Sequence, residues 1–248
     1  MVQRLILGIL ASTAVLGLSA AQARAGTFSI SPLRVELSSQ VQTGALTLRN
    51  QEDAPVVVQA EGLLWEQSDG EDRLTPTRDV LVSPAVFTVP ANGSQLIRVA
   101  LRRPADAGRE LSYRLILTEV PQQASPDLTG LNLALRLSLP IFVAPAASAE
   151  PQLEWTATRD TDGAIALTAR NAGSAHARVL SFTVAPATGA GPTVDERVTA
   201  YILPGQVRTW TLENNQNEGI PSTDSRRLRV KGTTEAGEFE AEVPLDTR

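Results

Sequence analysis

Residues 131–139 read Leu-Asn-Leu-Ala-Leu-Arg-Leu-Ser-Leu, so that every second residue is leucine. Successive side chains of a β-strand point to opposite faces, and this spacing therefore predicts a strand with one apolar face. An amphipathic helix would need apolar residues three and four positions apart. The leucines expected on the shared face are Leu131, Leu133, Leu135, Leu137 and Leu139. Such a strand either belongs to the core of its own β-sandwich or is lent to another protein.

The first 25 residues predict a secretory signal peptide. Arg4 gives a basic start, an apolar run follows over residues 5–20, and small-residue cleavage sites end at Ala23 and at Ala25. The apolar run is short for a membrane-spanning anchor, and we favour cleavage after Ala25. The mature chain would then begin at Gly26 and keep 223 of the 248 residues. No later segment is long and apolar enough to predict membrane insertion.

The composition of the mature chain argues against several function classes. Removing Arg4 and Arg24 leaves 20 basic against 27 acidic residues, a formal charge near −7. Nucleic-acid binding needs a basic face, so we expect no nucleic-acid partner. The chain contains no cysteine, and its fold must therefore be held by its cores alone. The length suits two domains of about 110 residues each.

Short apolar runs with a period of two, separated by turn residues, predict strands along the whole chain. The first set comprises Phe28–Leu37, Gly44–Arg49, Val56–Leu64, Ala85–Val89, Ser94–Leu101, Tyr113–Val120 and Leu131–Val143. The second set comprises Gln152–Thr158, Ala164–Arg170, Ala177–Ala185, Glu196–Ile202, Val207–Leu212, Arg226–Lys231 and Phe239–Val243. Seven strands is the number in an immunoglobulin-like sandwich.

A small-residue, proline-containing segment separates the two sets of strands. Residues 144–151 read Ala-Pro-Ala-Ala-Ser-Ala-Glu-Pro, show no periodicity, and predict a linker. We therefore predict an all-β protein of two immunoglobulin-like β-sandwich domains, with limits at 26–147 and 148–248.

The order of several sequence landmarks resembles the periplasmic chaperones of chaperone–usher pilus assembly. Ser31-Pro32-Leu33-Arg34-Val35 resembles the first strand of that family, and the segment from Arg109 to Pro121 resembles its signature segment. The other landmarks are Asn50, Pro55, Trp65, Ser83–Phe87, Gly93, Ile97–Val99 and Phe142–Pro145. The resemblance covers residues 27–145 well and the second domain only loosely.

This resemblance implies both a shape and a function. The two domains would form a boomerang, and the protein would bind pilin subunits, each an incomplete sandwich that lacks its last strand. The chaperone would lend the leucine-rich segment to fill the gap, which is donor-strand complementation, and would deliver the subunit to an outer-membrane usher. The expected location is the periplasm, and no enzymatic activity is expected. An exposed donor strand would also allow the free protein to associate with itself.

Two arginines are the expected anchor for the subunit. In the family, the residue matching Arg34 lies between the domains and binds the C-terminal carboxylate of the subunit, a role that suits a planar guanidinium. The family's second cation, a lysine, corresponds to Pro140, and the first domain of this chain contains no lysine. Arg136, four residues earlier on the same face, could supply that charge. The family's interdomain arginine corresponds to Ala144, and these departures favour a divergent branch such as that serving spore-coat-protein-U-like pilins.

Little in the sequence points to catalysis or to a cofactor. His176 is the only histidine and has no nucleophile-elbow motif beside it, so we expect a structural or surface role for it. One histidine without cysteine makes a conventional zinc site improbable, and no metal or cofactor is expected. The acidic residues around Asp69 are interpreted as a solvated turn. The alternative to a chaperone is an exported immunoglobulin-like adhesion or ligand-binding module that keeps the leucines in its own core.

Overall fold

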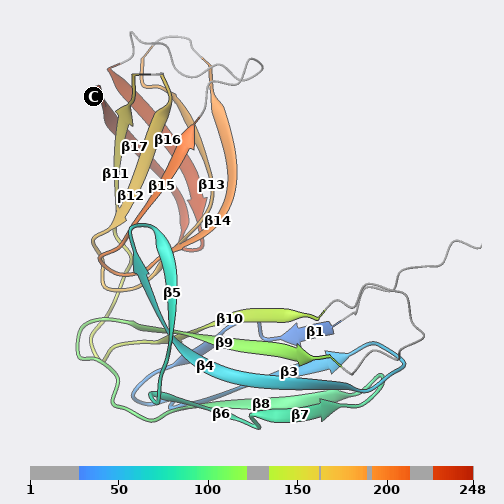
Figure 1. Ribbon diagram of the computed structural model, residues 1–248. Coiled ribbons are helices and arrows are strands. Elements are labelled where there is room, and N and C mark those ends of the chain that lie inside the picture. Colours follow the sequence, from blue (N-terminus) through green and yellow to red (C-terminus); the bar gives the residue numbers. More distant parts are fainter. Residues whose placement is uncertain (1–27, 122–133, 162, 189–191, 213–225, 248) are drawn as a thin grey trace, which may run out of the picture.

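The computed structural model describes residues 28–121, 134–161, 163–188, 192–212 and 226–247. Every regular element among them is a β-strand, and together they form two lobes that meet at one end in an L shape (Figure 1). The predicted all-β architecture of two sandwich domains is thereby confirmed. No helix in the described parts of the chain reaches the length and hydrophobicity of a membrane span.

The first domain is a sandwich of two sheets. Its strands are β1 (Phe28–Ser31), β2 (Val35–Leu37), β3 (Thr43–Asn50), β4 (Val56–Ser68), β5 (Glu71–Pro76), β6 (Val80–Ser83), β7 (Val86–Val89), β8 (Ser94–Leu101), β9 (Leu111–Val120) and β10 (Arg136–Val143). One sheet has the order β1-β3-β8-β6, and the other has the order β2-β10-β9-β4-β5, with β7 also paired to β4. All of these strands pair antiparallel except β2 and β10, which run parallel.

Two chain segments pass from one sheet to the other, each at a proline. The segment expected as a single strand over 28–37 divides into β1 and β2, which lie in different sheets, and β6 and β7 divide in the same way. Cis peptide bonds precede Pro32 and Pro84 at these two points. Proline lacks an N–H group and cannot continue a hydrogen-bonded ladder, so the first strand is free to leave its sheet there. This crossover brings β2 beside β10.

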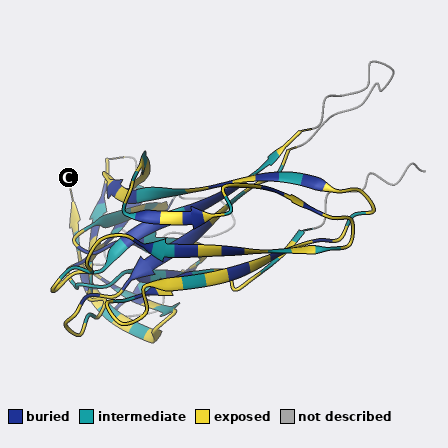
Figure 2. Ribbon diagram, turned by 90° about the horizontal axis from the view of Figure 1, so that it is seen from below, coloured by how far each residue is buried: buried dark blue, intermediate teal, exposed yellow. Residues whose placement is uncertain are grey.

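The predicted period of two is visible as alternating burial along the strands of the first domain (Figure 2). In β8, Ile97 and Val99 are fully buried while Ser94 is exposed. Ile141 and Val143 of β10 enter the same core, opposite Val35 and Leu37 of β2. The core of the first domain is therefore built from the inward faces of both sheets, as in a two-layer sandwich.

The second domain contains β11 (Leu153–Arg159), β12 (Ile165–Asn171), β13 (Ala177–Pro186), β14 (Val194–Ile202), β15 (Val207–Leu212), β16 (Arg227–Thr234) and β17 (Gly237–Thr247). Their order is β14-β13-β16-β17-β11-β12-β15. Strand β17 pairs antiparallel with β16 over 237–244 and parallel with β11 over 245–247. It thus joins the two halves of the sheet, which fold over a core of their own.

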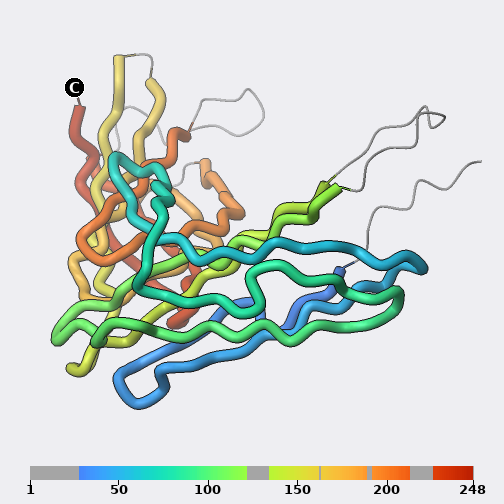
Figure 3. The backbone as a smooth tube through the Cα atoms, turned by 60° about the horizontal axis from the view of Figure 1, so that its bottom comes forward, coloured from blue at the N-terminus to red at the C-terminus, as the bar shows by residue number. Residues whose placement is uncertain are grey.

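The β4–β5 hairpin is a feature that the sequence analysis missed in part. The turn at 68–70 was recognised, and Asp69 and Gly70 both have positive φ, as a tight hairpin turn requires. Strand β5 was not predicted, because its face pattern is mostly exposed. The hairpin extends out of the first domain and lies against the second (Figures 1 and 3). Arg208 donates a hydrogen bond to the carbonyl of Gly70, which ties the tip of the hairpin to β15.

Candidate functional site

Strand β10 has one edge that is only partly covered. It pairs with β9 along 136–143, but β2 covers only 141–143 on the other side. The N–H of Glu119 donates to the carbonyl of Leu135 at 2.8 Å, and the N–H of Ala144 donates to the carbonyl of Leu37 at 2.8 Å. Because backbone groups alternate between the two neighbours, odd positions bond to β9 and even positions point to the β2 side. Among the described strands, none pairs with Arg136 or Ser138 there.

Proline at position 140 fits this arrangement. Position 140 lies opposite Arg114 of β9. Because it is an even position, its backbone groups point away from β9, and the N–H that proline lacks would not have bonded to β9. The ladder to β9 therefore loses no donor.

The leucine-rich segment lies where the covered core ends. Leu131 and Leu133 fall outside the described residues. Leu135 and Leu137 are half-buried and line a shallow depression with Phe28, Leu48, Val58, Leu117 and Glu119. Leu139 is 7% exposed and belongs to the core of the first domain. The apolar face of β10 thus runs continuously from the core at Leu139 to the rim at Leu135.

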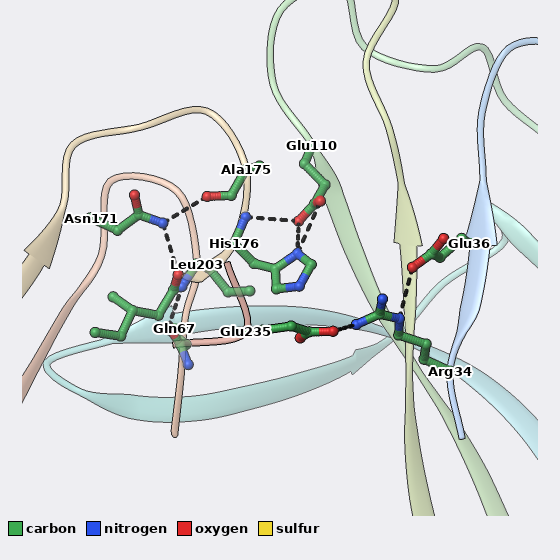
Figure 4. A network of polar contacts seen from close by, with 10 residues as sticks. Arg34, Glu36, Gln67, Glu110, Asn171, Ala175, His176, Leu203 and Glu235 are labelled. Carbon is green, nitrogen blue, oxygen red and sulfur yellow. Dashed lines mark hydrogen bonds and ion pairs between the residues drawn. The ribbon is translucent and has the colours of Figure 1, made fainter. Parts of the chain in front are cut away.

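Arg34 lies between the two domains, directly before β2. Its Nε is 2.7 Å from Oε1 of Glu36, and its Nη1 donates to Oε1 of Glu235 in the turn between β16 and β17 (Figure 4). Partial burial lowers the pKa of Arg34, but the hydrogen bond to Glu235 and the charges of Glu36 and Glu235 outweigh it and hold that pKa above its ordinary value. Arg34 is therefore already paired with carboxylates in the free protein.

Arg136 does not lie with Arg34. The parallel register of β2 and β10 sets Val35 beside Ile141, so Arg34 lies level with Pro140. Four residues of strand, about 13 Å, separate Pro140 from Arg136. The side chain of Arg136 is exposed, and the ion-pair partners of Arg34 among the described residues are Glu36 and Glu235. The structure thus does not bring the two expected anchor residues together.

An aromatic cluster fills the junction between the domains. Trp65, Phe142 and Leu203 are buried together, with Tyr201 packed against them. The guanidinium carbon of Arg114 lies 3.5 Å from the ring centroid of Trp65, a cation–π contact. Burial lowers the pKa of Arg114, although the nearby charge of Asp72 raises it. This cluster joins β4, β9 and β10 of the first domain to β14 of the second.

His176 forms the polar part of the same junction. Its Nδ1 lies 2.8 Å and 3.0 Å from the two carboxylate oxygens of Glu110, and its backbone N–H donates to Oε1 at 3.1 Å (Figure 4). Its ring stacks on Phe142 with the centroids 3.6 Å apart. Fully buried Asn171 holds the loop before it, donating from Nδ2 to the carbonyls of Ala175 and Ile202. His176 thus links the domains, a position that fits the structural role expected of it.

A cleft of about 450 Å³ opens beside Arg34. Its lining is Arg34, Pro151, Leu153, Trp155, Ala175, His176, Ala177, Arg178, Thr234, Glu235, Ala236, Phe239, Glu240 and Ala241. All of these except Arg34 come from residue 151 or later. The cleft therefore has cations, carboxylates and an apolar wall. Among the described residues, no group of three histidine or acidic side chains is arranged to hold a metal ion.

Sequence reasoning missed Glu110, Arg178 and Glu235. Glu110 lies within the segment that resembles the family signature, but nothing in that segment predicts its contact with His176. Glu235 is 201 residues from Arg34 along the chain, and no local pattern marks their contact. Arg178 alternates with buried residues at the start of β13, and this placement on the outward face was its only signal.

Comparisons with known proteins agree with this architecture. Residues 27–149 match the family model of the pili and flagellar-assembly chaperones, PapD N-terminal domain. The CsuC–CsuE chaperone–tip adhesion subunit complex of the archaic Csu pili of Acinetobacter baumannii matches with 21% identity and a TM-score of 0.64, over 88% of this chain and 99% of that one. No curated protein sequence matches the chain.

Two further solved structures show the same fold. The E. coli chaperone DraB has 22% identity and a TM-score of 0.59, covering 89% of this chain and 98% of that one. The SafB chaperone in complex with the SafA pilin of Salmonella enterica has 18% identity and a TM-score of 0.61, covering 88% and 97%. The likeness extends over both domains, whereas the family model covers the first. The first domain, residues 27–149, belongs to the PapD-like chaperones of pilus assembly.

Proposed function

We propose that this chaperone binds a pilin subunit by donor-strand complementation along β10 and delivers it to an outer-membrane usher. The open edge of β10 carries the proposal. The backbone groups of Arg136 and Ser138 face a side that no described strand covers. An added strand of the subunit would pair with them. The match of the first domain to the pilus-assembly chaperones supports the proposed delivery to an usher.

The apolar face of β10 supports the same proposal. Leu135 and Leu137 lie at the rim of the core, where a subunit with an open groove could cover them. Burying one leucine fully stabilises a complex by ~1.5–3 kcal/mol, before the costs of ordering and association. We include Leu131 and Leu133, which continue the same period of two, among the donor residues. Leu139 would act from within the chaperone core, because it is already buried there.

Arg34 is the proposed anchor for the subunit's C-terminal carboxylate. The contacts of Arg34 with the carboxylates of Glu36 and Glu235 support this role, because its guanidinium already donates to acidic partners between the domains. Arg136 as the second contact to the same carboxylate stays a prediction, and the distance along β10 does not favour it. Domain limits at 26–147 and 148–248, with signal-peptide cleavage after Ala25, are part of the proposal.

We further propose membership of a divergent branch, of the kind that serves spore-coat-protein-U-like pilins. Pro140 in place of the family's lysine supports this assignment, as does Ala144 in place of its interdomain arginine. Glu110 and His176 form one of the polar contacts that join the two domains. A free edge at β10 would also allow two copies of the protein to associate in the absence of subunit.

Co-expression with candidate pilins tests the function. A tagged chaperone should be purified from the periplasm together with one of them, in a complex of one chaperone and one subunit. A subunit expressed alone should be degraded or aggregate. If no candidate is captured, and the subunits remain soluble without the chaperone, the proposed function is wrong.

A further inference from the structure

We propose that the interdomain cleft recognises the last residue of the bound subunit. Arg34 and Arg178 would bind its carboxylate, and Trp155 and Phe239 would contact its side chain, which would be apolar. This inference rests on the proposed function and adds to it a second cation and a selectivity for the subunit's final side chain.

Arg178 supplies a second cation that no carboxylate of the described residues pairs with. It lies at the start of β13 and lines the cleft together with Arg34. Its Nε is buried, and within the described residues its guanidinium makes no hydrogen bond or ion pair. Its one side-chain contact of note is with the Tyr201 ring, 5.2 Å from the guanidinium carbon. A buried donor without an acceptor is unfavourable, and a carboxylate entering the cleft would supply the acceptor.

Glu235 shows that both arginines adjoin one place. Its carboxylate accepts a hydrogen bond from Arg34, and its backbone N–H donates to the carbonyl of Arg178 at the neighbouring strand. This backbone hydrogen bond is 3.0 Å long, measured from Glu235 N to Arg178 O. Glu235 therefore contacts the side chain of Arg34 and the backbone of Arg178, and all three residues line the same cleft. A carboxylate that replaced the Glu235 side chain at Arg34 would enter the cleft that Arg178 also lines.

Part of the lining of the cleft is aromatic. Trp155 and Phe239 are stacked with ring centroids 5.1 Å apart and an interplanar angle of 11°, and both are half-buried. Four alanines also line the cleft, and their small side chains leave the space beside the rings open: Ala175, Ala177, Ala236 and Ala241. An apolar side chain entering there would cover aromatic surface that water now contacts.

The charges of the cleft restrict what the pocket can accept. Glu235 and Glu240 both line it, so an acidic side chain on the final residue would meet like charges. A peptide end with a free carboxylate and an apolar side chain satisfies both the arginines and the aromatic wall. The cleft therefore favours subunits that end in an apolar or aromatic residue over those that end in aspartate or glutamate.

Short peptides test this pocket without a cognate subunit. The probes are N-acetyl-Gly-Gly-Phe with a free carboxylate, the same peptide as its amide, and N-acetyl-Gly-Gly-Glu. Each is titrated into the whole ¹⁵N-labelled mature protein while the arginine Nε–H and tryptophan Nε1–H signals are followed. We expect the free Phe peptide to move the Arg178 and Trp155 signals and to bind about tenfold more tightly than the amide or the Glu peptide, a difference of about 1.4 kcal/mol.

Single-residue variants distinguish the role of Arg178 from that of Phe239. Arg178→Ala should weaken binding of the free Phe peptide about tenfold, and Arg178→Lys should restore part of the loss because the charge is kept. Phe239→Ala should abolish the preference for Phe over Glu. Arg170→Ala is the matched control: Arg170 lies on β12, pairs with Glu154, and does not line the cleft. Unchanged circular dichroism and thermal unfolding establish that each variant is folded.

Two results would overturn the inference. One is that Arg178→Ala binds the free Phe peptide as the wild type does. The other is that the peptide leaves the signals of Arg178 and Trp155 unmoved, including the case of no binding at millimolar concentration. Either result leaves the proposed function standing if co-expressed pilin is still captured. If the peptide binds as expected but no pilin is captured, the proposed function fails and the pocket remains.

Discussion

Arg34 of the first domain is paired with Glu235 of the second, across 201 residues of sequence. The proposed anchor thus already holds a carboxylate belonging to the protein itself. A subunit that offers its C-terminal carboxylate must displace Glu235 before it can bind Arg34. The contact also connects the turn between β16 and β17 to the start of β2, so subunit binding and the relative position of the domains are expected to be coupled.

Glu235→Gln should strengthen subunit binding, because the competing charge is removed while the side-chain shape is kept. We expect a gain of roughly 3–10-fold in affinity, corresponding to the loss of one partly exposed ion pair. The measurement is titration with a purified subunit. Glu238→Gln, an exposed change in the same hairpin, is the control. Weaker binding by the Glu235 variant would show that Glu235 supports the anchor and does not compete with the subunit.

Leu135→Glu should abolish subunit binding and leave the free chaperone folded. Leu135 is half-buried at the rim, where a carboxylate can reach water, so we expect a stability loss below about 1 kcal/mol. Leu139→Glu, on the same face, should instead lower stability by more than about 3 kcal/mol, because it buries a charge in the core. Thermal unfolding and subunit capture are measured for both variants. Unfolding of the Leu135 variant would assign that leucine to the chaperone's own core.

Arg34→Ala should weaken subunit binding with little loss of chaperone stability. Extending the subunit by one glycine moves its carboxylate away and should cause a similar loss. The two changes remove the same contact, so their effects should not add when both are combined. Titration of each pairing gives the coupling. Full additivity would mean that Arg34 does not bind that carboxylate.

Arg136→Ala distinguishes the sequence-based anchor from the structure-based one. If Arg136 shares the carboxylate with Arg34, a double-mutant cycle should show coupling of ~0.5–3 kcal/mol. If Arg136 is an ordinary exposed residue, its loss should change binding by less than about 0.5 kcal/mol. The position of Arg136, about 13 Å along β10 from Pro140, leads us to expect the smaller effect. A cycle of Arg34→Ala with Arg178→Ala should show the larger coupling.

His176→Ala should loosen the junction between the domains. It removes the partner of Glu110, whose side chain is 9% exposed, together with the ring stacked on Phe142. We expect a stability loss of about 1–3 kcal/mol, because a nearly buried carboxylate loses hydrogen bonds. Small-angle scattering should show a wider range of domain arrangements. Glu110→Gln combined with His176→Ala should cost less than the sum of the two; simple additivity would argue against a direct link.

Local patterns in the sequence predicted most of the strands in both domains, but neither β5 nor β6. The leucines of 131–139 predicted an apolar strand face, and the structure shows that face from Leu135 through Val143. The turn at Asp69 and Gly70 was recognised because positive φ favours those residue types. Strand β5 was missed because the hairpin projects from the sandwich, and its exposed residues show no apolar alternation.

The sequence by itself determined the two-sandwich class, the family resemblance and Arg34, because backbone periodicity and turn chemistry act between residues close together in the chain. Tertiary structure alone decided which partners Arg34 has, that Arg136 lies apart from it, and that Arg178 faces the same cleft. It also decided the pairing of Glu110 with His176. These contacts depend on how two separately folded cores meet, and hydrogen bonds and ion pairs across that junction leave no periodic signal in the chain.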